Sequence, residues 1–232
     1  VASMETDTLA NANNSYKKVG ELLQQQGEYA REMGKAYLNA GASKGFLGIG
    51  SKASHGTKQR ESISSTAWNQ ARQVLGNDFY KVSDGRMTGL FDLSYEKLVK
   101  LRDEATGFWS ELHEDTRKYL EQVIESEEAW QEVQETRKEA MTGISFESVR
   151  SSFLDMLMDM DSSTVDFADN FEKYMQRAML NSMLSESYNE RLRKWYDSFA
   201  EAMEEKTEWR TGQGRRGRNR YKVTTEAAGV LS

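Results

Sequence analysis

Apolar side chains recur at intervals of three and four residues along most of this chain, which is the spacing of one face of an α-helix. Residues 4–38 predict a long, polar helix with only a thin apolar stripe, and residues 61–75 predict a short one. Ser94 is a good N-cap for a helix whose apolar face continues to Leu112. Asp115 caps the next predicted helix, which Gly143 can end.

Three shorter helical patterns follow between Ser145 and Met203. They contain many methionine and aromatic residues and no glycine. Methionine side chains repack easily, so this stretch predicts either a small bundle core or a surface that binds a partner. The residues expected to mediate self-association or partner binding are Phe153, Leu157, Phe167, Phe171, Tyr174, Met175, Trp195 and Phe199.

Residues 79–91 have a different pattern. Asp84-Gly85 lies between two short runs, and this dipeptide favours the type I′ turn of a β-hairpin. Residues 221–224 repeat the Tyr-Lys-Val pattern of residues 80–83 and could add a third strand. We therefore expect a small β-hairpin within an otherwise helical chain.

Gly20, Gly27 and Gly34 recur every seven residues on one face of the first predicted helix. Each glycine costs about 1 kcal/mol of helix propensity relative to alanine. Two interpretations follow: a locally weak helix, or a close contact with a second helix.

The predicted fold is all-α, a helical bundle or set of helical hairpins with the small β-hairpin. The expected organisation is a polar helix (1–38), a flexible Gly/Ser-rich loop (39–60), a short helix with the hairpin (61–92), a helical domain (93–205) and a basic tail that could supply an edge strand (206–232). The chain begins with Val1, which suggests a piece of a longer protein or a processed one.

Composition supports this fold and narrows the function. The chain has no proline, which suits uninterrupted helices, and no cysteine, which excludes disulfides and thiolate chemistry. Its net charge of −6 argues against general affinity for nucleic acid. No run approaches the ~18 apolar residues of a membrane-spanning helix.

Two motifs resemble ligand sites but lack required residues. The glycine-rich segment 45–52 ends in Ser51-Lys52, the reverse of the Lys-Ser/Thr order of a phosphate-binding loop. The aspartates between Asp159 and Asp169 lack the glycine and glutamate of an EF-hand loop. A mobile loop and a solvated acidic turn are the favoured interpretations.

Few other residues are candidates for a metal site, a catalytic nucleophile or a phosphate-binding site. A zinc site would need both histidines, His55 and His113, together with carboxylates. Ser54-His55 lacks the orienting group of a nucleophile–base pair. The arginines of residues 215–220 could bind phosphate, but a solvated tail is favoured. We predict no catalytic residue, metal, cofactor or small-molecule substrate.

Four segments resemble the C-terminal helical region of phage tail tape measure proteins, in the style of those carried by prophages of Bacteroides-type gut bacteria. They are residues 89–125, 143–149, 159–184 and 188–199, about half of the chain, and the stretch Phe167-Ala168-Asp169-Asn170-Phe171 is the most specific. The Ser-rich loop and the hairpin resemble that family's layout more loosely.

The resemblance implies a structural role without catalysis. Tape measure proteins are long helical chains in the tail tube, where their length sets how far the tube polymerises. It implies homo-oligomers, contacts with tail-tube or baseplate and tip proteins, and a location in the virion tail, or in the bacterial cytoplasm during assembly. The chain would be a compact end domain. The alternatives are a bacterial helical scaffold or adaptor and a tail-associated peptidoglycan hydrolase.

Overall fold

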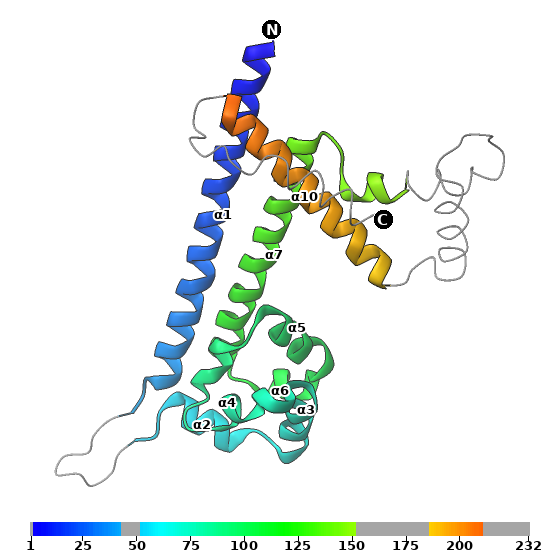
Figure 1. Ribbon diagram of the computed structural model, residues 1–232. Helices are drawn as coiled ribbons and strands as arrows, with labels where there is room; N and C mark the ends of the chain where they lie inside the picture. Colours follow the sequence, from blue (N-terminus) through cyan, green and yellow to red (C-terminus); the bar gives the residue numbers. More distant parts are fainter. Residues whose placement is uncertain (1, 43–51, 152–185, 211–232) are drawn as a thin grey trace. The chain divides into compact units, whose positions relative to one another are not determined.

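The computed structural model describes residues 2–42, 52–151 and 186–210, and its regular structure there is helical (Figure 1). The all-α prediction is confirmed. The long helices are α1 (Ala2–Asn39), α7 (Glu114–Thr142) and α10 (Glu186–Arg210). The short ones are α2 (His55–Ser62), α3 (Ser65–Leu75), α4 (Phe79–Ser83), α5 (Tyr95–Glu104) and α6 (Thr106–Glu111), with 3₁₀ turns η2 (Gly76–Asp78) and η3 (Thr88–Asp92).

The chain divides into two compact units. Residues 19–132 form one unit, called here the core unit. Residues 1–18 and 133–232 form the other, called here the terminal unit. Both α1 and α7 contribute residues to each unit, so the boundary falls within continuous helices.

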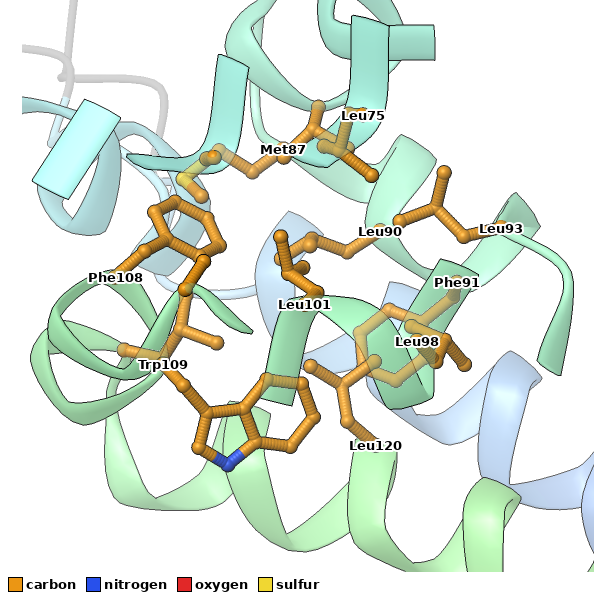
Figure 2. Close-up of a cluster of buried hydrophobic side chains, with 14 of the residues drawn as sticks. Leu75, Met87, Leu90, Phe91, Leu93, Leu98, Leu101, Phe108, Trp109 and Leu120 are labelled. Atoms are coloured by element: carbon orange, nitrogen blue, oxygen red, sulfur yellow. The ribbon is translucent and has the colours of Figure 1, made fainter. Parts of the chain in front are cut away.

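The core unit is built around one apolar cluster. Figure 2 shows its side chains converging from α3, η3, α5, α6 and α7. Leu98, Leu101 and Phe108 are fully buried there. The labelled members are Leu75, Met87, Leu90, Phe91, Leu93, Leu98, Leu101, Phe108, Trp109 and Leu120. Burying one such side chain contributes roughly 1.5–3 kcal/mol, so this cluster is the main stabilising feature of the unit.

Serine N-caps start three of the short helices. The hydroxyl groups of Ser54, Ser64 and Ser94 each accept a hydrogen bond from the backbone N–H three residues later. Each cap satisfies a donor that the first helical turn would otherwise leave unpaired. The N-cap predicted at Ser94 is confirmed.

The helix expected from Ser94 to Leu112 is interrupted at Ala105, whose φ and ψ are −112° and 54°. The side-chain oxygen of Gln70 on α3 accepts hydrogen bonds from the backbone N–H groups of Gly107 (2.9 Å) and Phe108 (3.3 Å). A distant side chain therefore caps the new helix α6. The break allows α5 and α6 to pack separately against α3.

The β-hairpin predicted for residues 79–91 is wrong. Residues 79–83 form α4, and residues 88–92 form η3. A turn does occur at Asp84-Gly85, where Gly85 has a φ of 53° and the N–H of Met87 donates to the carbonyl of Asp84 at 3.0 Å. Val82, Met87, Leu90 and Phe91 are all buried in one core, whereas the alternation of a hairpin would divide them between two faces. Residues 221–224 lie outside the described residues.

Two of the three repeating glycines of α1 lie in close contact with another element, as one of the two interpretations of the repeat predicts. A Cβ atom on Gly27 would lie 2.7 Å from the hydroxyl oxygen of Ser126 on α7. One on Gly34 would overlap the ring of Phe91. Gly20 is also buried. The close-contact interpretation therefore accounts for Gly27 and Gly34, because a side chain there would push the neighbouring element away.

The loop expected at residues 39–60 is shorter than predicted. α1 ends at Asn39, and α2 already begins at His55. Gly56, within α2, lies so close to the backbone carbonyl of Arg86 that a Cβ would be 1.9 Å from its oxygen. Packing of α2 against this turn accounts for the helix. The structure does not describe residues 43–51, which include most of the phosphate-loop-like segment.

In the terminal unit, α10 packs with the first residues of α1 and the last turns of α7. Tyr196 on α10 is fully buried and donates a hydrogen bond to the carbonyl oxygen of Ile144 at 2.7 Å. α7 ends at Thr142, and Gly143 follows with a φ of 75°, as the sequence predicts for a helix stop. Ser145 then accepts a hydrogen bond from the N–H of Ser148, so it caps the next turn.

Candidate binding pocket

A surface pocket of about 690 Å³ lies on the core unit, between α2, α3 and α4. Ser65, Trp68, Asn69 and Arg72 line it from α3, at the spacing that places them on one helix face. The other lining residues are Arg60 and Glu61 from α2 and Phe79 and Ser83 from α4. The pocket therefore combines two aromatic rings with two guanidinium groups and one carboxylate.

Trp68 and Phe79 are the apolar part of the pocket. Their rings meet edge to face, with centroids 5.9 Å apart and an interplanar angle of 86°. Trp68 also packs against the buried ring of Phe108, with centroids 5.4 Å apart. Since Phe108 belongs to the core cluster, the indole position is fixed by the core, while both pocket rings remain half-buried.

Arg60 and Arg72 are the cationic part of the pocket. The Nε–H of Arg60 donates to the backbone carbonyl of Ser83 at 2.9 Å, which joins α2 to the end of α4. The guanidinium carbon of Arg72 lies 4.8 Å from the centroid of the Phe79 ring, a cation–π geometry. Both arginines are exposed, and neither contact uses a carboxylate.

The helix that carries Trp68 is anchored at its start by an acidic side chain. Glu111, the last residue of α6, accepts hydrogen bonds from the Ser64 N–H (2.8 Å) and the Ser64 hydroxyl (2.9 Å). A carboxylate at a helix N-terminus also interacts favourably with the helix dipole. α3 is thereby held against α6 at the end where the pocket begins.

A second cluster brings together the two histidines that lie far apart in sequence. The ring of His55 stacks on Tyr37, with centroids 4.7 Å apart and an angle of 3°. Burial and then the charge of Asp115, to which its hydroxyl is hydrogen-bonded, raise the pKa of Tyr37. Burial and then the charge of His55 lower the pKa of His113 against the opposing effect of Asp115. The arrangement favours a neutral His113 at neutral pH.

Gln59 connects this cluster to the core. Its side chain is fully buried, and its carbonyl oxygen accepts a hydrogen bond from the backbone N–H of His113 at 2.6 Å. Its amide nitrogen lies 3.7 Å from the sulfur of Met87. Within residues 2–42, 52–151 and 186–210, no three His, Asp or Glu side chains are grouped so that they could hold a metal ion.

The terminal unit contains a polar network around Glu204. Its carboxylate pairs with Lys17 (2.6 Å) and Arg137 and accepts a hydrogen bond from the amide of Asn13 (3.2 Å). Arg137 in turn donates to the side-chain oxygen of Asn13 at 2.6 Å. Burial opposes the charge of Glu204, but the hydrogen bonds from Lys17, Asn13 and Arg137 hold its pKa below the usual range. These contacts join α1, α7 and α10.

Two of the predicted partner-binding residues lie in the described part of the chain. Trp195 and Phe199 are half-buried on α10, and their rings stack with centroids 5.5 Å apart at an angle of 17°. The structure therefore brings these two together. The other six, Phe153, Leu157, Phe167, Phe171, Tyr174 and Met175, lie outside the described residues, as does the acidic cluster between Asp159 and Asp169.

Sequence reasoning missed the pocket residues. The apolar face of a helix over residues 61–75 comprises Ile63, Ala67, Ala71, Val74 and Leu75 and does not include Trp68. The sequence signal that could have indicated the pocket is the pair Trp68 and Arg72, which are four residues apart and lie at the edge of that apolar face. No local pattern indicates that Phe79 and Arg60 line the same pocket as Trp68.

No helix in the described part of the chain is long and apolar enough to cross a bilayer. Comparison with known protein families, with curated protein sequences and with solved structures gave no match to this chain.

Proposed function

We propose that this chain is a non-enzymatic structural component of a phage tail, a tape measure protein domain that takes part in tail length determination and tail assembly. The observation that carries the proposal is the helical architecture, with a 38-residue α1 and a 29-residue α7. At 1.5 Å per residue, α1 is about 57 Å long. The resemblance of four segments to tape measure proteins supports the same assignment.

In this proposal the chain is an end domain that associates with its own copies and with tail-tube, baseplate or tip proteins. The core unit supports such a role because its pocket presents a tryptophan, a phenylalanine and two arginines. Tryptophan and arginine are enriched among the residues that contribute most to protein–protein binding. The stacked Trp195 and Phe199 on α10 provide a second half-exposed aromatic site.

Virion composition tests the assignment. Particles induced from the host that carries the gene should contain peptides of this chain in the purified tail fraction, and an in-frame deletion should abolish tails or alter their length in electron micrographs. The proposal would be contradicted if mass spectrometry found no peptide of this chain in purified tails and the deletion strain still made tails of normal length. A zymogram on purified peptidoglycan tests the non-enzymatic part, and a zone of clearing by the purified chain would overturn it.

The pocket favours one alternative, a bacterial helical adaptor unrelated to phage. An adaptor needs a binding site on a helical support, and the pocket of the core unit would serve as one. Such a protein would be found with cellular partners in uninduced cells and would be missing from tail fractions. The same mass spectrometry experiment therefore distinguishes the two functions.

A further inference from the structure

Among the described residues, the large apolar side chains that are exposed gather on α1. They are Leu9, Val19, Leu22, Tyr29 and Tyr80, and the first four belong to that helix. The exposed fractions of Val19, Leu22 and Tyr29 are 45%, 58% and 62%. Single exposed apolar side chains are normal on a protein surface, whereas a group of them that share one face marks a site of interaction.

The exposed apolar residues of α1 follow a heptad spacing. Two series of residues seven apart, offset by three, form one face, called here the outer face: Val19, Gln26 and Met33, and Leu22, Tyr29 and Ala36. This is the spacing of the a and d positions in the seam of a coiled coil. All six side chains are exposed or half-buried, and none carries a charge. The spacing therefore indicates that another α-helix binds the outer face.

The outer face is distinct from the face by which α1 packs within the core unit. Gly27 and Gly34 belong to the packed face, where they lie against Ser126 and Phe91. Each residue of the outer face comes one position before, or two positions after, one of the repeating glycines, which places the outer face about a third of a turn away. Packing within the core unit thus leaves the outer face exposed.

The charges beside the outer face indicate which helix binds there. On the side away from the packed face, Lys18, Gln25 and Glu32 recur at the same heptad spacing. Both charged side chains are exposed. In coiled coils, charged residues beside the seam determine the choice and orientation of the partner. With a cation near one end and an anion near the other, this edge is complementary to itself when one helix is reversed.

An antiparallel pair of α1 helices uses this complementarity twice. A twofold axis between the two copies places Lys18 of each beside Glu32 of the other. In a parallel pair, each residue lies level with its own copy, so like charges would be level at both ends. We propose that the outer face of α1 binds the outer face of a second copy of this chain, with the two helices antiparallel.

The register that brings Lys18 beside Glu32 also aligns the apolar side chains. It places the short Val19 level with the long Tyr29. A contact between two single helix faces is small, and interfaces that bury less than about 1,200 Å² are generally weak. We therefore expect a dimer that forms at high protein concentration. The inference deepens the self-association in the proposed function, and in that respect it rests on the proposed function.

The first experiment is analytical ultracentrifugation of the full chain over a range of concentrations. The average mass should rise towards that of a dimer. Leu22→Glu with Tyr29→Glu should weaken the association about tenfold or more, because each copy then brings two charges into the seam. Gln24→Glu with Tyr80→Glu is the matched control, since it adds the same charge at exposed positions that lie off the outer face.

Thermal unfolding followed by circular dichroism checks the fold of each variant, and all four substituted side chains are exposed. An unmodified chain that stays monomeric at every concentration would overturn the proposal. Equal association of the two double variants would also overturn it, because the dimer would then use another surface.

Charge reversal tests the antiparallel arrangement. Lys18→Glu and Glu32→Lys should each weaken the association about fivefold at low salt, because each places like charges side by side twice in the dimer. The double variant Lys18→Glu/Glu32→Lys keeps the net charge of −6 and should associate as tightly as the unmodified chain. Added salt should reduce these differences. Unchanged association of both single variants, or a double variant as weak as the single ones, would overturn the antiparallel arrangement.

These measurements use the purified chain, so their failure is distinct from failure of the proposed function. A chain that is monomeric in solution but present in purified tails would overturn this inference and leave the tail assignment standing. A chain that forms the antiparallel dimer but is missing from tails would support this inference and overturn the tail assignment.

Discussion

The core unit and the terminal unit are stabilised by different interactions. Among the described residues of the core unit, twenty buried apolar residues form one cluster, and serine side chains cap α2, α3 and α5. In the terminal unit, fewer described side chains are buried, and α1, α7 and α10 are joined by ion pairs around Glu204 and Asp197. Apolar burial is strong and non-directional, whereas paired charges require a particular register.

This difference suggests a division of roles. A core fixed by apolar packing can hold a pocket in one shape, because Trp68 rests on Phe108. Helices joined by polar contacts are less strongly stabilised, since half-exposed ion pairs contribute little net free energy. Four predictions test the comparison, from the largest expected effect to the smallest.

Phe108→Ala should cause the largest loss. The side chain is fully buried in the core unit, and its removal leaves a cavity beneath Trp68. We expect the free energy of unfolding to fall by about 3–5 kcal/mol. Urea denaturation followed by tryptophan fluorescence measures it. A loss below about 1 kcal/mol would contradict the central position of this ring.

Gly56→Ala should destabilise the core unit by about 1–3 kcal/mol, because the new Cβ would overlap the carbonyl oxygen of Arg86 and the backbone must move. Gly76→Ala is the control for a glycine without close neighbours. Its φ is 53° and its ψ is −120°, so a backbone strain of about 1–3 kcal/mol applies there without a steric clash. Hydrogen exchange should show faster exchange in α2 and in residues 84–87 for Gly56→Ala alone.

Glu204→Gln should destabilise the terminal unit by about 1–2 kcal/mol, since Arg137 and Lys17 lose a carboxylate that is partly buried. Hydrogen exchange should accelerate in α10 and leave α5 and α6 unchanged. Glu201→Gln, an exposed position on the same helix, is the matched control. Uniform acceleration through both units would contradict their separate stabilisation.

Acidification should cause the smallest losses in the free energy of unfolding, and each unit should lose stability in a different pH range. The lowered pKa of His113 means that the unfolded chain binds a proton first as the pH falls below about 6.5, so stability is lost from there downward. Glu204 also has a lowered pKa, and its contribution is lost at lower pH, below the ordinary glutamate range. Thermal unfolding of wild type and His113→Asn across this range measures the first window. An unchanged profile in the variant would contradict the assignment to His113.

Much of the fold could be predicted from local patterns. The span of α1, the end of α3 at Leu75, the cap at Ser94 and the stop at Gly143 follow from periodicity, capping chemistry and glycine conformation. The start of α3 does not, because the helix predicted over residues 61–75 is broken at Ile63 and Ser64. These signals are local because the hydrogen bonds and dihedral angles involved lie within a few residues. The eight predicted partner-binding residues rest on the same local patterns, and Trp195 and Phe199 are the two that lie among the described residues.

The sequence by itself therefore determined that the chain is helical and where several helices begin and end. Only the tertiary structure decided that residues 79–91 form helical turns, that Gly27 and Gly34 lie against α7 and Phe91, and that Arg60, Trp68 and Phe79 share a pocket. The physical reason is the range of the interactions. Hydrogen bonds within a helix connect neighbours in sequence. Burial in a common core depends instead on which segments, distant in sequence, pack together in the folded chain.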